Sequence, residues 1–134
     1  MDARNDRLKG FLFAWSATEI FVNKAFSSYS RNSSSNEVRI PGTSAYAKRV
    51  AKATESGKYA LLDRFVVIAA LLGDKSENVD ELDSDVEVFK RIKDIRDELF
   101  HGQDILETSL PSLTVELQSL LSKSLRRHLE QVNS

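Results

Sequence analysis

Apolar residues recur at helical spacing along most of the chain, and the alternation typical of strands is scarce. The first such stretch runs from about residue 6 to residue 30 and predicts a long helix. Its apolar stripe consists of Leu8, Leu12, Trp15, Val22, Phe26 and Tyr29. Glu19 falls inside this stripe, where a carboxylate needs a partner or a place at the edge of the core.

The middle of the chain predicts a short basic helix followed by an apolar one. A polar and then extended connection leads to Ser44, which we expect to be the N-cap of a helix over residues 45–56. Gly57 interrupts the pattern, and residues 58–72 are apolar nearly all round, which predicts the central and most buried helix. Gly73 is the expected C-cap of that helix.

A strongly acidic segment, residues 74–85, precedes the next helix and is interpreted as an exposed loop. Ser84 with Glu87 three residues later forms a capping-box pattern, so we expect the helix to begin there. Its buried stripe runs from Val88 to Leu99, and Gly102 ends it.

Pro111 lies near the expected first turn of the last helix, whose leucine-rich face extends from Leu113 to Val132. The chain has 134 residues, two prolines and no internal repeat, so residues 1–134 are interpreted as one domain. The predicted fold is all-α, an antiparallel four-helix bundle with one extra short helix.

Composition narrows the possible functions. The net charge of −1 gives no overall basic field for non-specific nucleic-acid binding. The absence of cysteine excludes disulfides and thiolate zinc sites. The longest apolar run, residues 65–72, is too short to span a bilayer, and we expect a cytoplasmic protein without membrane contact. No glycine-rich phosphate loop or metal-ligand cluster is present, so neither a cofactor nor a metal is expected.

The residues most suited to catalysis lie at the end of the helix predicted between Ser84 and Gly102. They are Arg96, Asp97 and His101. Residues four apart share a helix face, so Asp97 is expected to accept a hydrogen bond from the His101 imidazole and to orient it. Arg96 would stand beside them as a fixed cation. A histidine with a pKa near neutrality can deprotonate a ribose 2′-hydroxyl, and an arginine can stabilise the charge that builds on the phosphate.

The segment RDELFHG, with its Arg and His separated by four residues, resembles the signature of the HEPN superfamily. The tryptophan-containing first helix (WSATE) and the helix order are similar to Apea-like and related HEPN domains. The resemblance implies a metal-independent endoribonuclease with Arg96, Asp97 and His101 as catalytic residues. It further implies a homodimer with one composite cleft, in a toxin–antitoxin or antiviral setting with a possible antitoxin or regulatory partner. Gln103 stands where one toxin branch carries a modified tyrosine, which argues against that form of control.

Further residues are candidates for RNA binding. Three cations share one side of the short helix and either guide an RNA backbone or form a solvated face: Lys48, Arg49 and Lys52. Lys93 would extend the basic surface toward Arg96. Glu19 would either pair with Arg96 or line the cleft, and the alternative is a half-exposed carboxylate at the edge of the bundle.

Three interpretations of function remain open from the sequence. The first is the HEPN-type ribonuclease. The second is a non-catalytic HEPN-like module that binds RNA, a nucleotide or a protein partner. The third is a plain helical dimerisation domain.

Overall fold

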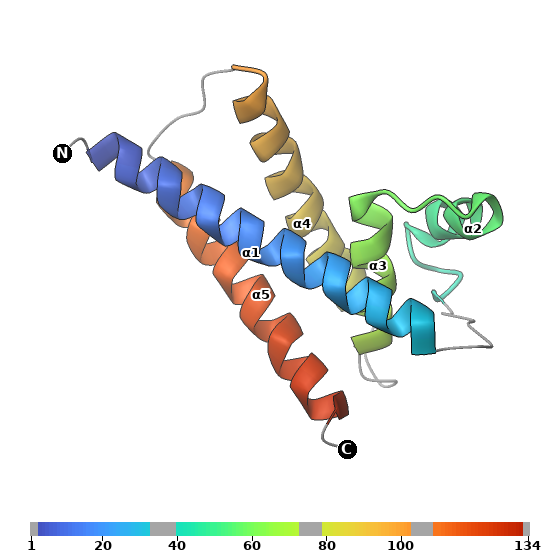
Figure 1. Ribbon diagram of the computed structural model, residues 1–134. Coiled ribbons are helices and arrows are strands. Elements are labelled where there is room, and N and C mark those ends of the chain that lie inside the picture. Colours follow the sequence, from blue (N-terminus) through green and yellow to red (C-terminus); the bar gives the residue numbers. More distant parts are fainter. Residues whose placement is uncertain (1–2, 33–39, 73–78, 103–108, 133–134) are drawn as a thin grey trace.

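The protein is all-helical in the part of the chain that the computed structural model describes, residues 3–32, 40–72, 79–102 and 109–132 (Figure 1). The predicted all-α class is therefore confirmed, with four long helices and one short one. In chain order the helices are α1 (Ala3–Asn32), α2 (Ala47–Ser56), α3 (Leu61–Leu72), α4 (Val79–Phe100) and α5 (Leu110–Val132).

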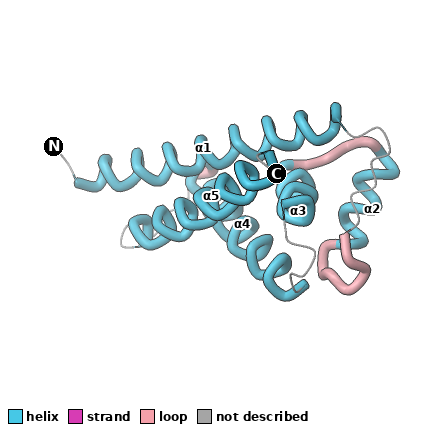
Figure 2. Tube along the Cα trace, turned by 90° about the horizontal axis from the view of Figure 1, so that it is seen from below, coloured by secondary structure: helices cyan, strands magenta, loops and turns pink. Residues whose placement is uncertain are grey.

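The helices pack around α3, which contacts every other helix. α3 and α4 run in opposite directions, as do α4 and α5, whereas α1 and α5 run in the same general direction (Figures 1 and 2). The strictly antiparallel order predicted for the long helices therefore does not hold for the α1–α5 pair. The short helix α2 lies on the outside, beside α3.

The core is built on α3 and on an aromatic group at its centre. Phe89 of α4 is fully buried and stacks on Phe65 of α3, with ring centroids 4.2 Å apart and planes 5° apart. Trp15 of α1 also packs against Phe89, with ring centroids 5.5 Å apart. The prediction that α3 is the most buried helix is confirmed, since seven of its residues are buried: Leu62, Asp63, Phe65, Val66, Val67, Ile68 and Leu72.

The third long helix begins earlier than the sequence predicted. α4 starts at Val79, so the expectation of an exposed acidic loop is wrong for residues 79–85, and residues 74–78 lie outside the described part. Ser84 is therefore an interior residue of α4, and the capping box is wrong. The carboxylates of Asp80 and Glu81 favour a helix start because they face the positive end of its dipole.

The start of α2 also differs from the prediction. The N-cap is Tyr46, and Ser44 lies before it. The Ser44 hydroxyl accepts a hydrogen bond from the Tyr46 N–H at 3.1 Å and donates one to Asp83 at 2.7 Å. Ser44 therefore stabilises the turn that leads into α2 and ties it to α4. Gly57 ends α2 as expected, in the left-handed region at φ 72°. The expected C-cap at Gly73 lies outside the described residues.

Two helices bury different residues than their patterns suggested. On α1 the core face also contains four residues that the predicted stripe omitted: Phe11, Ala14, Thr18 and Ala25. On α5 the apolar face is buried only in its first half, at Leu113, Leu117 and Leu120. Leu125 and Leu129 are exposed because the other long helices leave that end of α5 uncovered on one side.

Candidate functional site

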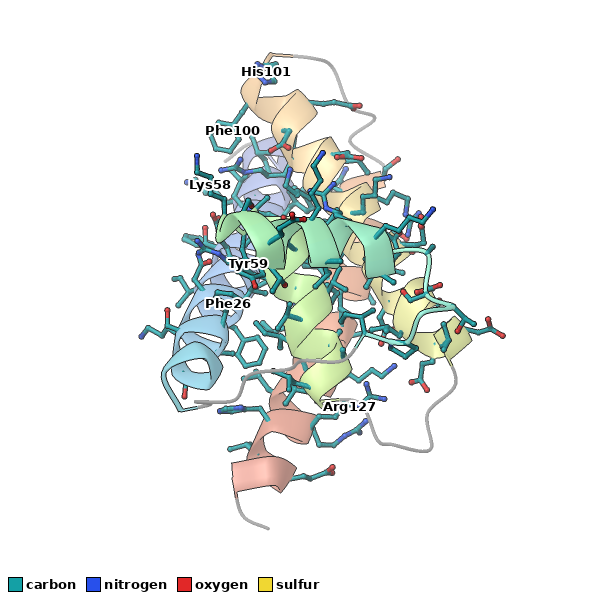
Figure 3. All side chains as sticks on the ribbon, turned by 90° about the vertical axis from the view of Figure 1, so that its right-hand side faces the viewer. Phe26, Lys58, Tyr59, Phe100, His101 and Arg127 are labelled. Carbon is teal, nitrogen blue, oxygen red and sulfur yellow. The ribbon has the colours of Figure 1, made fainter. Side chains whose placement is uncertain are left out.

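The C-terminal end of α4 carries the candidate residues, and a tight last turn defines it. The His101 N–H donates to the carbonyls of Asp97 and Glu98, each at 3.1 Å, and the Gly102 N–H donates to the carbonyl of Leu99 at 3.1 Å. Gly102 then takes φ 79°, a left-handed conformation that suits glycine. The helix therefore stops at Phe100 and presents His101 at its tip (Figure 3).

Asp97 organises the cations of the site. It accepts hydrogen bonds from Lys93 Nζ at 2.9 Å and from Arg96 Nη1 at 3.0 Å. The hydrogen bond from Lys93, joined by the one from Arg96, holds the pKa of the Asp97 carboxyl below its ordinary value despite the opposing effect of burial. Asp97 is therefore an anion that fixes the position of Arg96.

Arg96 is also held from its other side. Its guanidinium carbon lies 4.1 Å from the centroid of the Phe100 ring, within the range of a cation–π contact. The two residues are four apart, so they share a helix face. Arg96 Nε is buried without a hydrogen-bond acceptor among the described residues. Asp97 and Phe100 together fix the orientation of the guanidinium.

His101 is exposed, and its side chain makes no hydrogen bond or ion pair with any described residue. The expectation that Asp97 orients the imidazole is therefore not met, because both Asp97 oxygens are engaged by Lys93 and Arg96. Among the described residues, the exposed imidazole therefore has no competing hydrogen-bond partner. The structure thus brings Arg96, Asp97 and Lys93 together and leaves His101 beside them as a separate group.

Glu19 does not form the ion pair with Arg96 that was one of its predicted roles. It is half-buried on α1, and within the described part of the chain it forms no ion pair with Arg96, whose side chain contacts Asp97 and Phe100 instead. The alternative that the sequence left open, a carboxylate at the edge of the bundle, agrees with this placement.

The basic residues of α2 lie away from His101 within one chain. α2 packs beside α3, on the side away from the C-terminal end of α4 (Figures 1 and 2). Lys48 and Lys52 are exposed, whereas Arg49 donates through Nε to Asp63 at 2.5 Å. Arg49 thus anchors α2 to α3, and within the described part of one chain the cations of α2 lie apart from His101.

Phe100 is the residue that sequence reasoning missed. It is 65% exposed at the end of α4, next to His101 (Figure 3). The sequence could have predicted its contact with Arg96, because residues four apart lie on the same face of a helix. It was overlooked because it lies outside the buried stripe.

Among the described residues, no three His, Asp or Glu side chains gather in a group that could hold a metal ion. None of the described helices combines the length and apolar character needed to cross a membrane. Family models, curated proteins and solved structures were compared with the chain, and none of them matches it.

Proposed function

We propose that the protein is a metal-independent endoribonuclease of the HEPN type, with its reactive groups at the C-terminal end of α4. One observation carries the proposal. A cation fixed by two neighbours, Arg96, and an exposed imidazole, His101, which has no partner among the described residues, lie at the same helix end. These are two of the three groups that cleavage of RNA through its own 2′-hydroxyl requires, the third being a general acid.

The reaction follows from these groups. The imidazole of His101 takes the proton of the ribose 2′-hydroxyl while the 2′ oxygen attacks the adjacent phosphorus. The bond from phosphorus to the 5′ oxygen breaks, and that oxygen receives a proton from a general acid. The products are a 2′,3′-cyclic phosphate and a free 5′-hydroxyl. Arg96 donates hydrogen bonds to the phosphate oxygens as their negative charge increases.

A homodimer supplies the second proton-transfer group. The chain contains only two histidines, and His128 is engaged elsewhere, with its ring packed edge-on against Phe21 of α1. We propose that His101 of a second copy acts as the general acid in a composite cleft. Phe100 and His101 are exposed at the C-terminal end of α4, where a second copy could contact them. The resemblance to HEPN proteins supplies the setting of toxin–antitoxin or antiviral defence, with an antitoxin or regulatory protein as a further partner.

The non-catalytic binding module is the second candidate, and one observation favours it. No described residue orients the His101 imidazole, because Asp97 is committed to Lys93 and Arg96. A cationic end of a helix with an exposed aromatic ring can bind RNA or a nucleotide without cleaving it.

Cleavage of mixed cellular RNA in EDTA separates the two candidates. We expect the wild type and a His128→Ala variant, the matched control, to cleave RNA and leave cyclic phosphate ends. His101→Ala should lose roughly 100- to 10,000-fold in rate, as expected for the loss of a general base. Thermal unfolding confirms that both variants fold. Cleavage that survives in His101→Ala contradicts the proposal, and binding without cleavage by the wild type supports the module.

A further inference from the structure

The Phe100 ring has one covered face and one open face. The Arg96 guanidinium lies over the ring at 4.1 Å from its centroid, yet the residue remains 65% exposed. Because the guanidinium covers one face, this exposure requires that the other face and the edge are open to solvent. Figure 3 shows the ring projecting from the end of α4 next to His101.

An open aromatic face at this position is a surface for a ring-shaped ligand. The apolar ring loses favourable burial by facing solvent, and no described element packs on its free side. Because the Arg96 guanidinium lies against the other face of the ring, a suitable ligand has both a flat ring and a negatively charged group close to it. A nucleotide combines a base that stacks on an aromatic ring with a phosphate that an arginine binds.

We propose that the open face of Phe100 stacks on a base adjoining the phosphate that Arg96 binds, and that this contact selects single-stranded RNA with a preference for purines. The inference rests on the proposed ribonuclease function and names its substrate class. Phe100 would be a specificity-determining residue, while the proton transfer remains with His101.

Attack of the 2′-hydroxyl on the phosphate is helped by an aromatic ring that holds a neighbouring base outside the stacked helix. In-line attack by a 2′-hydroxyl needs the two nucleotides around the phosphate to leave the regular stacked helix. Proteins that bind unstacked RNA stabilise the freed base on an aromatic side chain. Phe100 and His101 are consecutive residues, whose Cα atoms are about 3.8 Å apart. A base on Phe100 and the ribose next to it can therefore contact the ring and the imidazole together. Purines present the larger ring surface and gain more from stacking.

Binding measured without turnover tests the inference. In a His101→Ala background, fluorescence anisotropy would follow a labelled oligoadenylate and an abasic oligomer of the same length. Phe100→Leu should weaken binding of the oligoadenylate roughly 5- to 100-fold, the range for one lost base stack, and leave the abasic oligomer unchanged. Phe100→Tyr should retain the wild-type affinity because it keeps the ring. Phe13→Leu, which replaces another exposed phenylalanine on α1, is the matched control and should change neither.

The outcomes separate this inference from the function on which it rests. Phe100→Leu that leaves both affinities unchanged, or lowers both equally, overturns base stacking. A shift of dimer to monomer in Phe100→Leu, seen by analytical ultracentrifugation, also overturns it, because the ring would then pack against a second copy. Binding that depends on the base and on Phe100, found together with a wild type that cleaves no RNA, supports stacking and rejects the ribonuclease function alone.

Discussion

Arg49 on α2 holds the buried carboxylate of Asp63 on α3, with Arg49 Nε donating to Asp63 Oδ1 over 2.5 Å. The same carboxylate accepts the N–H of Ala60 at 2.9 Å, which satisfies one of the free donors at the start of α3. One aspartate therefore caps a core helix and anchors the peripheral one. Asp63 needs both partners, because a buried charge without a partner is strongly unfavourable.

Arg49→Ala should lower the free energy of unfolding by about 1–3 kcal/mol, since it leaves a buried acceptor without its charged donor. Chemical denaturation measures the change. Lys48→Ala is the matched control, because Lys48 is exposed on the same helix and should change stability by less than about 0.5 kcal/mol. Equal effects of the two variants would show that the bond to Asp63 does not hold α2 in place.

Phe89→Ala should destabilise the protein by about 3–5 kcal/mol, because the ring is fully buried against Phe65 and Trp15. Phe89→Leu retains much of the volume and should cost less. Thermal or urea unfolding gives both values, and near-ultraviolet circular dichroism reports the packing of Trp15. A change below 1 kcal/mol for Phe89→Ala would contradict its central place in the core.

The wild type should lose stability on acidification more steeply than Glu81→Gln. A hydrogen bond from Lys123, together with one from Arg127, lowers the pKa of Glu81. Because the folded pKa lies below the unfolded one, the stabilisation is present above the ordinary carboxyl pKa of about 4.3 and is lost as the pH falls through the lowered value. Glu81 is partly exposed, so the contribution should stay below about 1 kcal/mol.

Unfolding free energies measured from pH 7 to pH 2.5 would show this difference. Asp97, whose pKa is lowered by Lys93 and Arg96, contributes to the same decline in both proteins. Parallel pH curves for the wild type and Glu81→Gln would show that Glu81 has no such stabilising role.

Asp97→Asn should slow RNA cleavage by misplacing Arg96, without removing the proton-transfer group. Asp97 contacts Arg96 and Lys93 and not the imidazole, so its loss should misplace the guanidinium and leave the proton-transfer group intact. We expect a decrease of roughly 10-fold or more in kcat/KM. A rate equal to that of the wild type would show that the contact between Asp97 and Arg96 does not position the guanidinium for cleavage.

Local residue patterns predicted the helices well where apolar residues or a terminal glycine define them. Residues 61–72 are apolar on nearly every side, and the helix they form is the buried centre of the fold. Gly57 and Gly102 mark the ends of α2 and α4, because both adopt a left-handed conformation there. The start of α4 was mispredicted because the same carboxylates that suit an exposed loop also suit the positive end of a helix.

The candidate site was only partly predictable, because a helical spacing gives the face of a residue and not its partner. The i, i+4 rule places Asp97 on the same face as both Lys93 and His101. Lys93 lies inside α4, and its side chain extends one turn forward to Asp97. His101 lies in the turn that ends α4. The carboxylate therefore binds the cations within the helix.

The sequence by itself determined the all-α class, the helix end at Gly102 and the presence of Arg96, Asp97 and His101 near it, because these depend on contacts within a few residues. Only the tertiary structure decided that Arg49 anchors α2 to Asp63 and that Phe100 keeps an open face. Helices can pack in many relative positions at similar cost, so the partners of a side chain follow from the arrangement of all the helices around α3.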